Sequence, residues 1–135
     1  MKIKSLHHVG VQTECYDESK KFYTEILGFK TIKEIPNFHG RDYNTWLKLD
    51  EIIIELQVAK PSTNLKELKL SNEEPMHISF LVENVENAYK EIKSKGYNNF
   101  KLKNGEEIYK GENCYLFKLK APEGTEIEVR DNQKI

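Results

Sequence analysis

Residues 5–13 read SLHHVGVQT, and this stretch decides the fold because its pattern recurs in the second half of the chain. Val9 and Val11 share one face of a predicted strand, while small and polar residues, His8 among them, occupy the other face. His7 falls on the valine face because side chains alternate along a strand. Two adjacent histidines therefore point in opposite directions, and the question is which of them takes part in chemistry.

A helix and three strands are predicted to follow this opening strand. The helix covers residues 17–27, where Asp17 can cap its start and Gly28 ends it. A loop is expected over 36–40 and a hairpin turn near Asp50. The strands are predicted over residues 29–35, 43–49 and 51–59.

The same order of elements returns in the second half. A strand is predicted over residues 76–82 and a helix over 84–95, with further strands over 100–102, 114–119 and 125–130. His8 lies 20 residues before Gly28, and His77 lies 19 residues before Gly96. We therefore predict an α+β fold in which two βαβββ modules form a pseudo-twofold pair within one domain, 1–135. The modules cover about 1–60 and 75–135, joined by a polar linker over about 61–74 that holds a short helix.

Size and composition indicate a small globular protein. The chain has 135 residues, a net charge of -1, 38% hydrophobic residues and 32% charged residues, which argues against a nucleic-acid-binding protein. No apolar run approaches 18 residues and no basic leader precedes an apolar segment, so we expect a cytoplasmic protein with no membrane contact. Cys15 and Cys114 lie far apart without a CxxC motif, and we expect free thiols.

Each module places one histidine and one glutamate on the strand face that its helix does not cover. Any one of these residues is commonly just solvated there, but all four occupy matching places in the two modules. If the two sheets curve toward each other, the four side chains converge. Two imidazoles and two carboxylates can hold a divalent first-row metal and leave positions open; Zn, Ni and Co come first, and Mn and Fe are further choices. The predicted ligands are His8, Glu55, His77 and Glu128.

The sequence resembles the vicinal oxygen chelate superfamily, the glyoxalase and bleomycin-resistance-like proteins. The resemblance covers nearly the whole chain and rests on HVGV at 8–11, SKKFY at 19–23 with LGF at 27–29, IEL at 54–56, HISFLV at 77–82 and PEGTEIEV at 122–129. The doubled histidine, Arg41, Trp46 and Pro61-Ser62 are most similar to small bacterial proteins of the glyoxalase family. The common Asp-Pro-x-Gly turn reads Ala121-Pro122-Glu123-Gly124 here, which should change a local hydrogen bond and no ligand.

This resemblance implies an incomplete barrel around a metal, a homodimer, and ligand positions at His8, Glu55, His77 and Glu128. His8 is then the ligand of the doublet. His7 is expected to pack at the strand edge or to fix the first helix, with a hydrogen bond to the ligand shell as the alternative. The sequence leaves open whether the modules that share a metal come from one subunit or from two.

The ligand set matches that of glyoxalase I, which isomerises the hemithioacetal of an α-oxoaldehyde to a thioester through an enediolate. In that reading Glu128 is the base and Glu55 the more permanent ligand, although the two can share these roles. Arg41 is the candidate clamp for a substrate carboxylate, and an ion pair with Asp42 or another carboxylate is its alternative.

Other activities of this fold remain open. An extradiol-type dioxygenase would need only His8, His77 and Glu128 on Fe(II), so Glu55 argues against it. An acyl-thioester epimerase would use nearly the same proton transfer, and an antibiotic-resistance transferase would use two histidines and one glutamate. A metal-free module that sequesters a drug or ligand would not need the four ligands. The sequence does not identify the metal, the substrate or the thiol.

Overall fold

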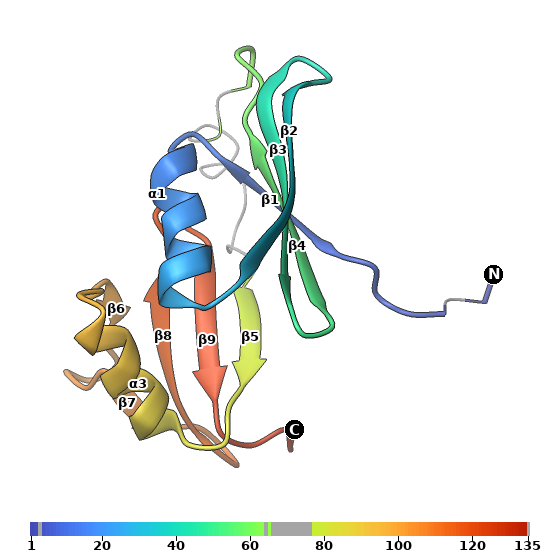
Figure 1. Cartoon of the computed structure of the whole chain (residues 1–135). Helices are drawn as coiled ribbons and strands as arrows, with labels where there is room; N and C mark the ends of the chain where they lie inside the picture. Colours follow the sequence, from blue (N-terminus) through green and yellow to red (C-terminus); the bar gives the residue numbers. More distant parts are fainter. Residues whose placement is uncertain (3, 64, 66–76, 135) are drawn as a thin grey trace. The chain divides into compact units, whose positions relative to one another are not determined.

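The computed structural model describes residues 1, 2, 4–63, 65 and 77–134 (Figure 1). The chain forms two compact units, Met1–Leu70 and Ser71–Ile135, which we call unit 1 and unit 2. Most of the linker predicted over 61–74, where a short helix is expected, lies outside the described residues.

Unit 1 contains one four-stranded sheet in the order β1-β4-β3-β2. The first and last strands, β1 and β4, run parallel, and the other neighbouring pairs are antiparallel. The helical segment between β1 and β2 starts as an α-helix and ends as a π-helix. The elements are β1 (Val9–Thr13), α1 (Tyr16–Lys21), η1 (Phe22–Ile26), β2 (Lys30–Phe38), β3 (Arg41–Leu49) and β4 (Ile52–Val58).

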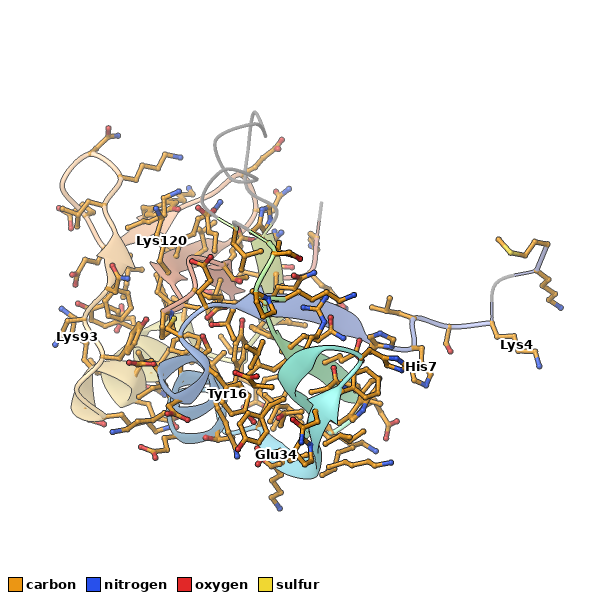
Figure 2. The ribbon with its side chains drawn as sticks, turned by 90° about the horizontal axis from the view of Figure 1, so that it is seen from above. Lys4, His7, Tyr16, Glu34, Lys93 and Lys120 are labelled. Carbon is orange, nitrogen blue, oxygen red and sulfur yellow. The ribbon has the colours of Figure 1, made fainter. Side chains whose placement is uncertain are left out.

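Helix α1 covers one face of the unit 1 sheet. Tyr16 of α1 stacks on Tyr43 of β3, with ring centroids 5.0 Å apart, and its hydroxyl bonds the Thr45 hydroxyl and the Glu34 carboxylate. Figure 2 labels Tyr16 and Glu34, which approach each other from α1 and β2. Apolar side chains that alternate onto this same face are fully buried and form the core, namely Leu47, Ile54 and Leu56.

Unit 2 repeats this plan with its own sheet, in the order β5-β9-β8-β6, and β7 also pairs with β8. Again the first and last strands, β5 and β9, run parallel, while β8 and β9 are antiparallel. The elements are β5 (His77–Leu81), α3 (Val85–Ser94), β6 (Phe100–Lys101), β7 (Ile108–Lys110), β8 (Tyr115–Lys120) and β9 (Glu126–Arg130).

Helix α3 packs on one face of the unit 2 sheet. Its start is capped by Asn84, whose side-chain oxygen accepts a hydrogen bond of 2.9 Å from the Asn87 backbone N–H. Tyr89 of α3 contacts the rings of Phe100 in β6 and Phe117 in β8. In both units, one sheet face therefore packs on a helix, and the opposite face carries the polar residues that the sequence singles out.

The predicted α+β class and the βαβββ order of both modules are confirmed. The predicted cap at Asp17 is wrong, because Cys15 occupies the cap position and makes no side-chain capping bond. The predicted loop over 36–40 is also wrong, since β2 continues through Pro36 to Phe38 before a turn at His39-Gly40. Proline fits there because β2 is an edge strand, where a missing N–H breaks no ladder. Strand β7 was not predicted.

Among the described residues, no helix has the length and apolarity needed to cross a bilayer.

Candidate metal centre

The strand register places a histidine and a glutamate in the same relation in both units. Gly10 of β1 pairs with Glu55 of β4, and Ser79 of β5 pairs with Glu128 of β9. In each unit the histidine lies two residues before the small residue of that pair, which puts it on the glutamate's side of the sheet. The two sets are His8 with Glu55, which we call the unit 1 pair, and His77 with Glu128, the unit 2 pair.

The unit 1 pair is in direct contact. His8 Nε2 lies 3.3 Å from Glu55 Oε2, and both side chains are only partly exposed. Metal–ligand bonds of about 2.0–2.2 Å put neighbouring donors of one first-row ion roughly 3.0–3.4 Å apart. The two atoms therefore have the spacing of two ligands of a single ion, and an imidazole with a carboxylate suits a divalent first-row metal.

His8 is held by two aromatic neighbours. Its Nδ1 lies 2.7 Å from His7 Nδ1, and its ring meets the Trp46 ring edge-on at 5.0 Å. His7 lies where the N-terminal segment joins β1 (Figure 2). It is exposed, and its contact with His8 agrees with the alternative expectation of a hydrogen bond to a predicted ligand. The expectation that the two histidines point in opposite directions is wrong, because both rings meet Trp46. Because Nδ1 is used in this contact, Nε2 is the nitrogen of His8 that faces Glu55.

In the unit 2 pair, Glu128 is the more constrained member. Its Oε1 accepts a hydrogen bond of 2.9 Å from the Ser79 hydroxyl, and its Oε2 lies 3.5 Å from Lys118 Nζ. Arg130 approaches Oε1 at 3.9 Å, and Glu128 is 8% exposed. His77 lies exposed on the same face, and its side chain forms no hydrogen bond or ion pair with another described residue.

A second glutamate of β9, Glu126, belongs to an ion-pair network. It bonds Lys101 of β6, and Lys118 Nζ lies 2.8 Å from its Oε1. Burial alone raises the pKa of Glu126, but the hydrogen bonds from the two lysines outweigh it and hold that pKa below 4.5. Burial lowers the pKa of Lys118, yet the bond to Glu126 and the charge of Glu128 leave it raised. Glu126 is thus occupied as a carboxylate, and Lys118 is a cation beside Glu128.

Arg41 lies away from the unit 1 pair. One of its terminal nitrogens donates a hydrogen bond of 2.6 Å to the Val58 carbonyl, and it forms no ion pair with Asp42. Strand alternation puts Arg41 on the face of Thr45, opposite that of Trp46. Its role in binding substrate stays a prediction.

Sequence reasoning missed an amide pair on the Glu55 face. Gln57 Nε2 donates a hydrogen bond of 2.8 Å to Asn44 Oδ1 across β3 and β4. Asn44 is fully buried, and its Nδ2 has no partner among the described residues. Only the register, which pairs Asn44 with Gln57, could have signalled this contact.

Over residues 1, 2, 4–63, 65 and 77–134, no three His, Cys, Asp or Glu side chains gather as a metal site would require. Each pair supplies two donors. Cys15 and Cys114 are free thiols, as expected.

The family model for the Glyoxalase/Bleomycin resistance protein/Dioxygenase superfamily matches residues 5–129. The chain is 30% identical over 97 residues to the uncharacterized protein YwkD of Bacillus subtilis (strain 168), which covers 71% of this chain and 75% of that protein. It is 34% identical over 96 residues to the protein named Glyoxylase I 4 of Arabidopsis thaliana, covering 70% of this chain and 53% of that protein. The match thus spans about half the length of the plant relative.

Solved structures show the same fold. A glyoxalase family protein from Enterococcus faecalis superposes with a TM-score of 0.77 at 23% identity, covering 97% of this chain and all of that one. Lactoylglutathione lyase from Agrobacterium tumefaciens gives a TM-score of 0.70 at 13% identity, with 98% and 96% covered. A fosfomycin resistance protein from Listeria monocytogenes, solved with Mn(II), gives 0.70 at 14% identity, with 98% and 94% covered.

Proposed function

Because the chain belongs to the Glyoxalase/Bleomycin resistance protein/Dioxygenase superfamily, we propose that it is a divalent-metal-dependent lyase or isomerase of the glyoxalase I type. Its substrate would chelate the metal through two neighbouring oxygens, as the hemithioacetal of an α-oxoaldehyde does. Support comes from the names of two similar proteins, Glyoxylase I 4 and lactoylglutathione lyase.

The observation that carries this proposal is the matched register of the two pairs, together with the 3.3 Å approach of His8 to Glu55. The ligands of one ion would be His8, Glu55, His77 and Glu128. When bound, a metal such as Zn, Ni, Co, Mn or Fe supplies a Lewis acid that stabilises negative charge on the substrate oxygens. The proposal requires the two pairs to meet on one ion, within one chain or across a homodimer.

Glu128 is the proposed base. As a carboxylate, it takes the proton from C1 of the hemithioacetal, and the electron pair of the broken C–H bond remains on the substrate. It then returns the same proton to C2, and the hydroxyl proton moves from the C1 oxygen to the C2 oxygen, which gives the 2-hydroxy thioester and restores the carboxylate. Glu55 stays in place as a ligand.

A turnover assay tests this function. The metal-loaded protein is given methylglyoxal with glutathione or another small thiol, and thioester formation is followed by absorbance. A catechol and an acyl thioester serve as substrates for the dioxygenase and epimerase alternatives. Turnover of the hemithioacetal is expected, whereas turnover of only one of the other two substrates would replace the proposal with that activity.

Variants of two glutamates in β9, Glu128 and Glu126, test which residue is the base. Glu128→Gln should lower kcat by about 100-fold or more, because an amide cannot accept the proton. Glu126→Gln, two residues away and occupied by lysines, should keep kcat within about threefold of the wild type. Equal losses in both variants would contradict the assignment of the base.

A further inference from the structure

The two pairs differ at the positions that flank their glutamates. The neighbour of Glu55 on the parallel strand is Gly10, while the neighbour of Glu128 is Ser79. On the antiparallel side, Glu55 is paired with Trp46 and Glu128 with Lys118. In unit 2, both flanking positions therefore carry a side chain that contacts Glu128. In unit 1, neither flanking residue forms a hydrogen bond or ion pair with the side chain of Glu55.

These differences leave Glu55 available to a ligand. Among the described residues its one polar contact is with His8, because Gly10 has no side chain and Trp46 presents its ring to His8. Among the described residues, the Glu55 carboxylate and His8 Nε2 thus have no polar partner other than each other. A divalent ion between them would satisfy both, which suits a permanent ligand.

Glu128 already has partners on both oxygens. The Ser79 hydroxyl bonds Oε1 at 2.9 Å, and the Lys118 ammonium lies 3.5 Å from Oε2. This carboxylate is 8% exposed, so without such partners its charge would be costly to bury. Glu128 is therefore held in one orientation without a metal contact.

We propose that Ser79 and Lys118 are positioning residues that orient the Glu128 carboxylate toward the substrate C–H and would weaken its hold on a metal. This inference rests on the proposed function and adds the residues that position its base. It also assigns roles to two residues, one of which lies on β8 with no sequence motif of its own.

The physical basis is competition for one carboxylate. A lysine ammonium beside Oε2 would repel a divalent cation that approached Glu128, and the Ser79 bond occupies a lone pair of Oε1. Both residues should therefore weaken the hold of the metal on Glu128. A residue that only supports the fold would have the opposite effect, since its loss would loosen the ligand and weaken metal binding.

Lys101 provides a matched control for Lys118. The two lysines face each other across β6 and β8, and both bond Glu126. Only Lys118 also reaches Glu128. Lys101→Met and Lys118→Met should therefore lower the free energy of unfolding in urea by similar amounts, but only Lys118→Met should change the affinity for a metal.

The experiment measures Co²⁺ affinity by competition with a chromophoric chelator, together with kcat and KM for the hemithioacetal. Lys118→Met should bind Co²⁺ about fivefold more tightly and lose about tenfold in kcat, whereas Lys101→Met should stay within about twofold on both. Ser79→Ala should shift both quantities in the same directions as Lys118→Met, and Ser79→Thr, which keeps the hydroxyl, should restore them.

This inference is overturned if Lys118→Met and Ser79→Ala bind Co²⁺ no more tightly than the wild type. It is also overturned if Lys101→Met gains as much Co²⁺ affinity as Lys118→Met. In those cases wild-type Co²⁺ binding and turnover would leave the proposed function standing. A wild type that binds no Co²⁺ would overturn the proposed function itself. The Ser79 variants keep the test decisive if Lys118→Met fails to fold.

Discussion

His8 uses its two ring nitrogens for different partners. Nδ1 meets His7 at 2.7 Å, and Nε2 meets Glu55 at 3.3 Å. When Nε2 binds a metal, the hydrogen of the imidazole is on Nδ1, and His7 Nδ1 must accept it. A partner of this kind fixes the tautomer and the ring orientation of a metal-binding histidine.

Loss of His7 should therefore weaken metal binding. We predict that His7→Ala lowers Co²⁺ affinity by about tenfold, because His8 loses the acceptor that orients its ring. Competition titration with a chelator measures this. His39→Ala is the control, since His39 lies in the β2–β3 turn and its ring contacts Phe38. Equal affinities in the wild type and His7→Ala would contradict this role.

The sequence predicted part of the candidate site. Strand alternation placed Glu55 on the face of His8, and the structure shows their contact. Alternation also placed Ser79 on the face of His77, but not its bond to Glu128. Lys118 could not be predicted, because its approach to Glu128 depends on the register of β8 against β9, and residue patterns set strand faces without setting register.

At the scale of elements, long periodic segments were predictable and local exceptions were not. Helix α3 and the hairpin around Asp50 agree with their patterns of apolar and turn residues. Pro36 falls in the predicted loop over 36–40, but the sheet order places β2 at an edge, where a strand tolerates proline. Strand β7 spans three residues, which is too short for a period to appear.

The cap of α3 gives a prediction for this element. Asn84→Ala should reduce the free energy of unfolding by about 1 kcal/mol, since the Asn87 backbone N–H loses its acceptor. Urea unfolding followed by circular dichroism measures it. Asn87→Ala is the control, because it keeps that N–H and puts a better helix former in the first turn. A loss in the control as large as in Asn84→Ala would contradict the capping role.

The Glu126 network predicts a pH dependence of unit 2. The pKa of Glu126 is lower in the folded chain than its ordinary value of 4.5, so the folded state binds its proton less readily. Its contribution to stability is therefore present above about pH 4.5 and is lost as the pH falls through the folded pKa. Urea unfolding between pH 7 and pH 3 should show a smaller acid-induced loss in Glu126→Gln than in the wild type. Equal losses of unfolding free energy between pH 7 and pH 3 in the wild type and in Glu126→Gln would contradict the ion-pair network.

At the scale of the whole molecule, the chain is one plan used twice. Each unit pairs its first strand in parallel with its last, covers one sheet face with a helix and keeps a histidine and a glutamate on the other. The repeat could be predicted from the order of elements. The donors that distinguish Glu128 from Glu55 could not, because they depend on contacts within each sheet.

The proposed metal should stabilise the chain by mass action. An excess of Co²⁺ at about 100 times its dissociation constant should raise the free energy of unfolding by roughly 2.7 kcal/mol. The gain should vanish in a His8→Ala/Glu128→Ala double variant and persist in His39→Ala. Thermal or urea unfolding with and without metal measures it, and a gain retained by the double variant would place the ion elsewhere.

The most direct test of the central claim is metal content, measured by mass spectrometry on protein purified without chelator or affinity metal. The wild type is compared with His8→Ala, from unit 1, and His77→Ala, from unit 2, after reloading with each candidate ion. We predict about one divalent ion per chain in the wild type and its loss in both variants. No metal in the wild type, or full metal content in either variant, would contradict a single ion held by both pairs.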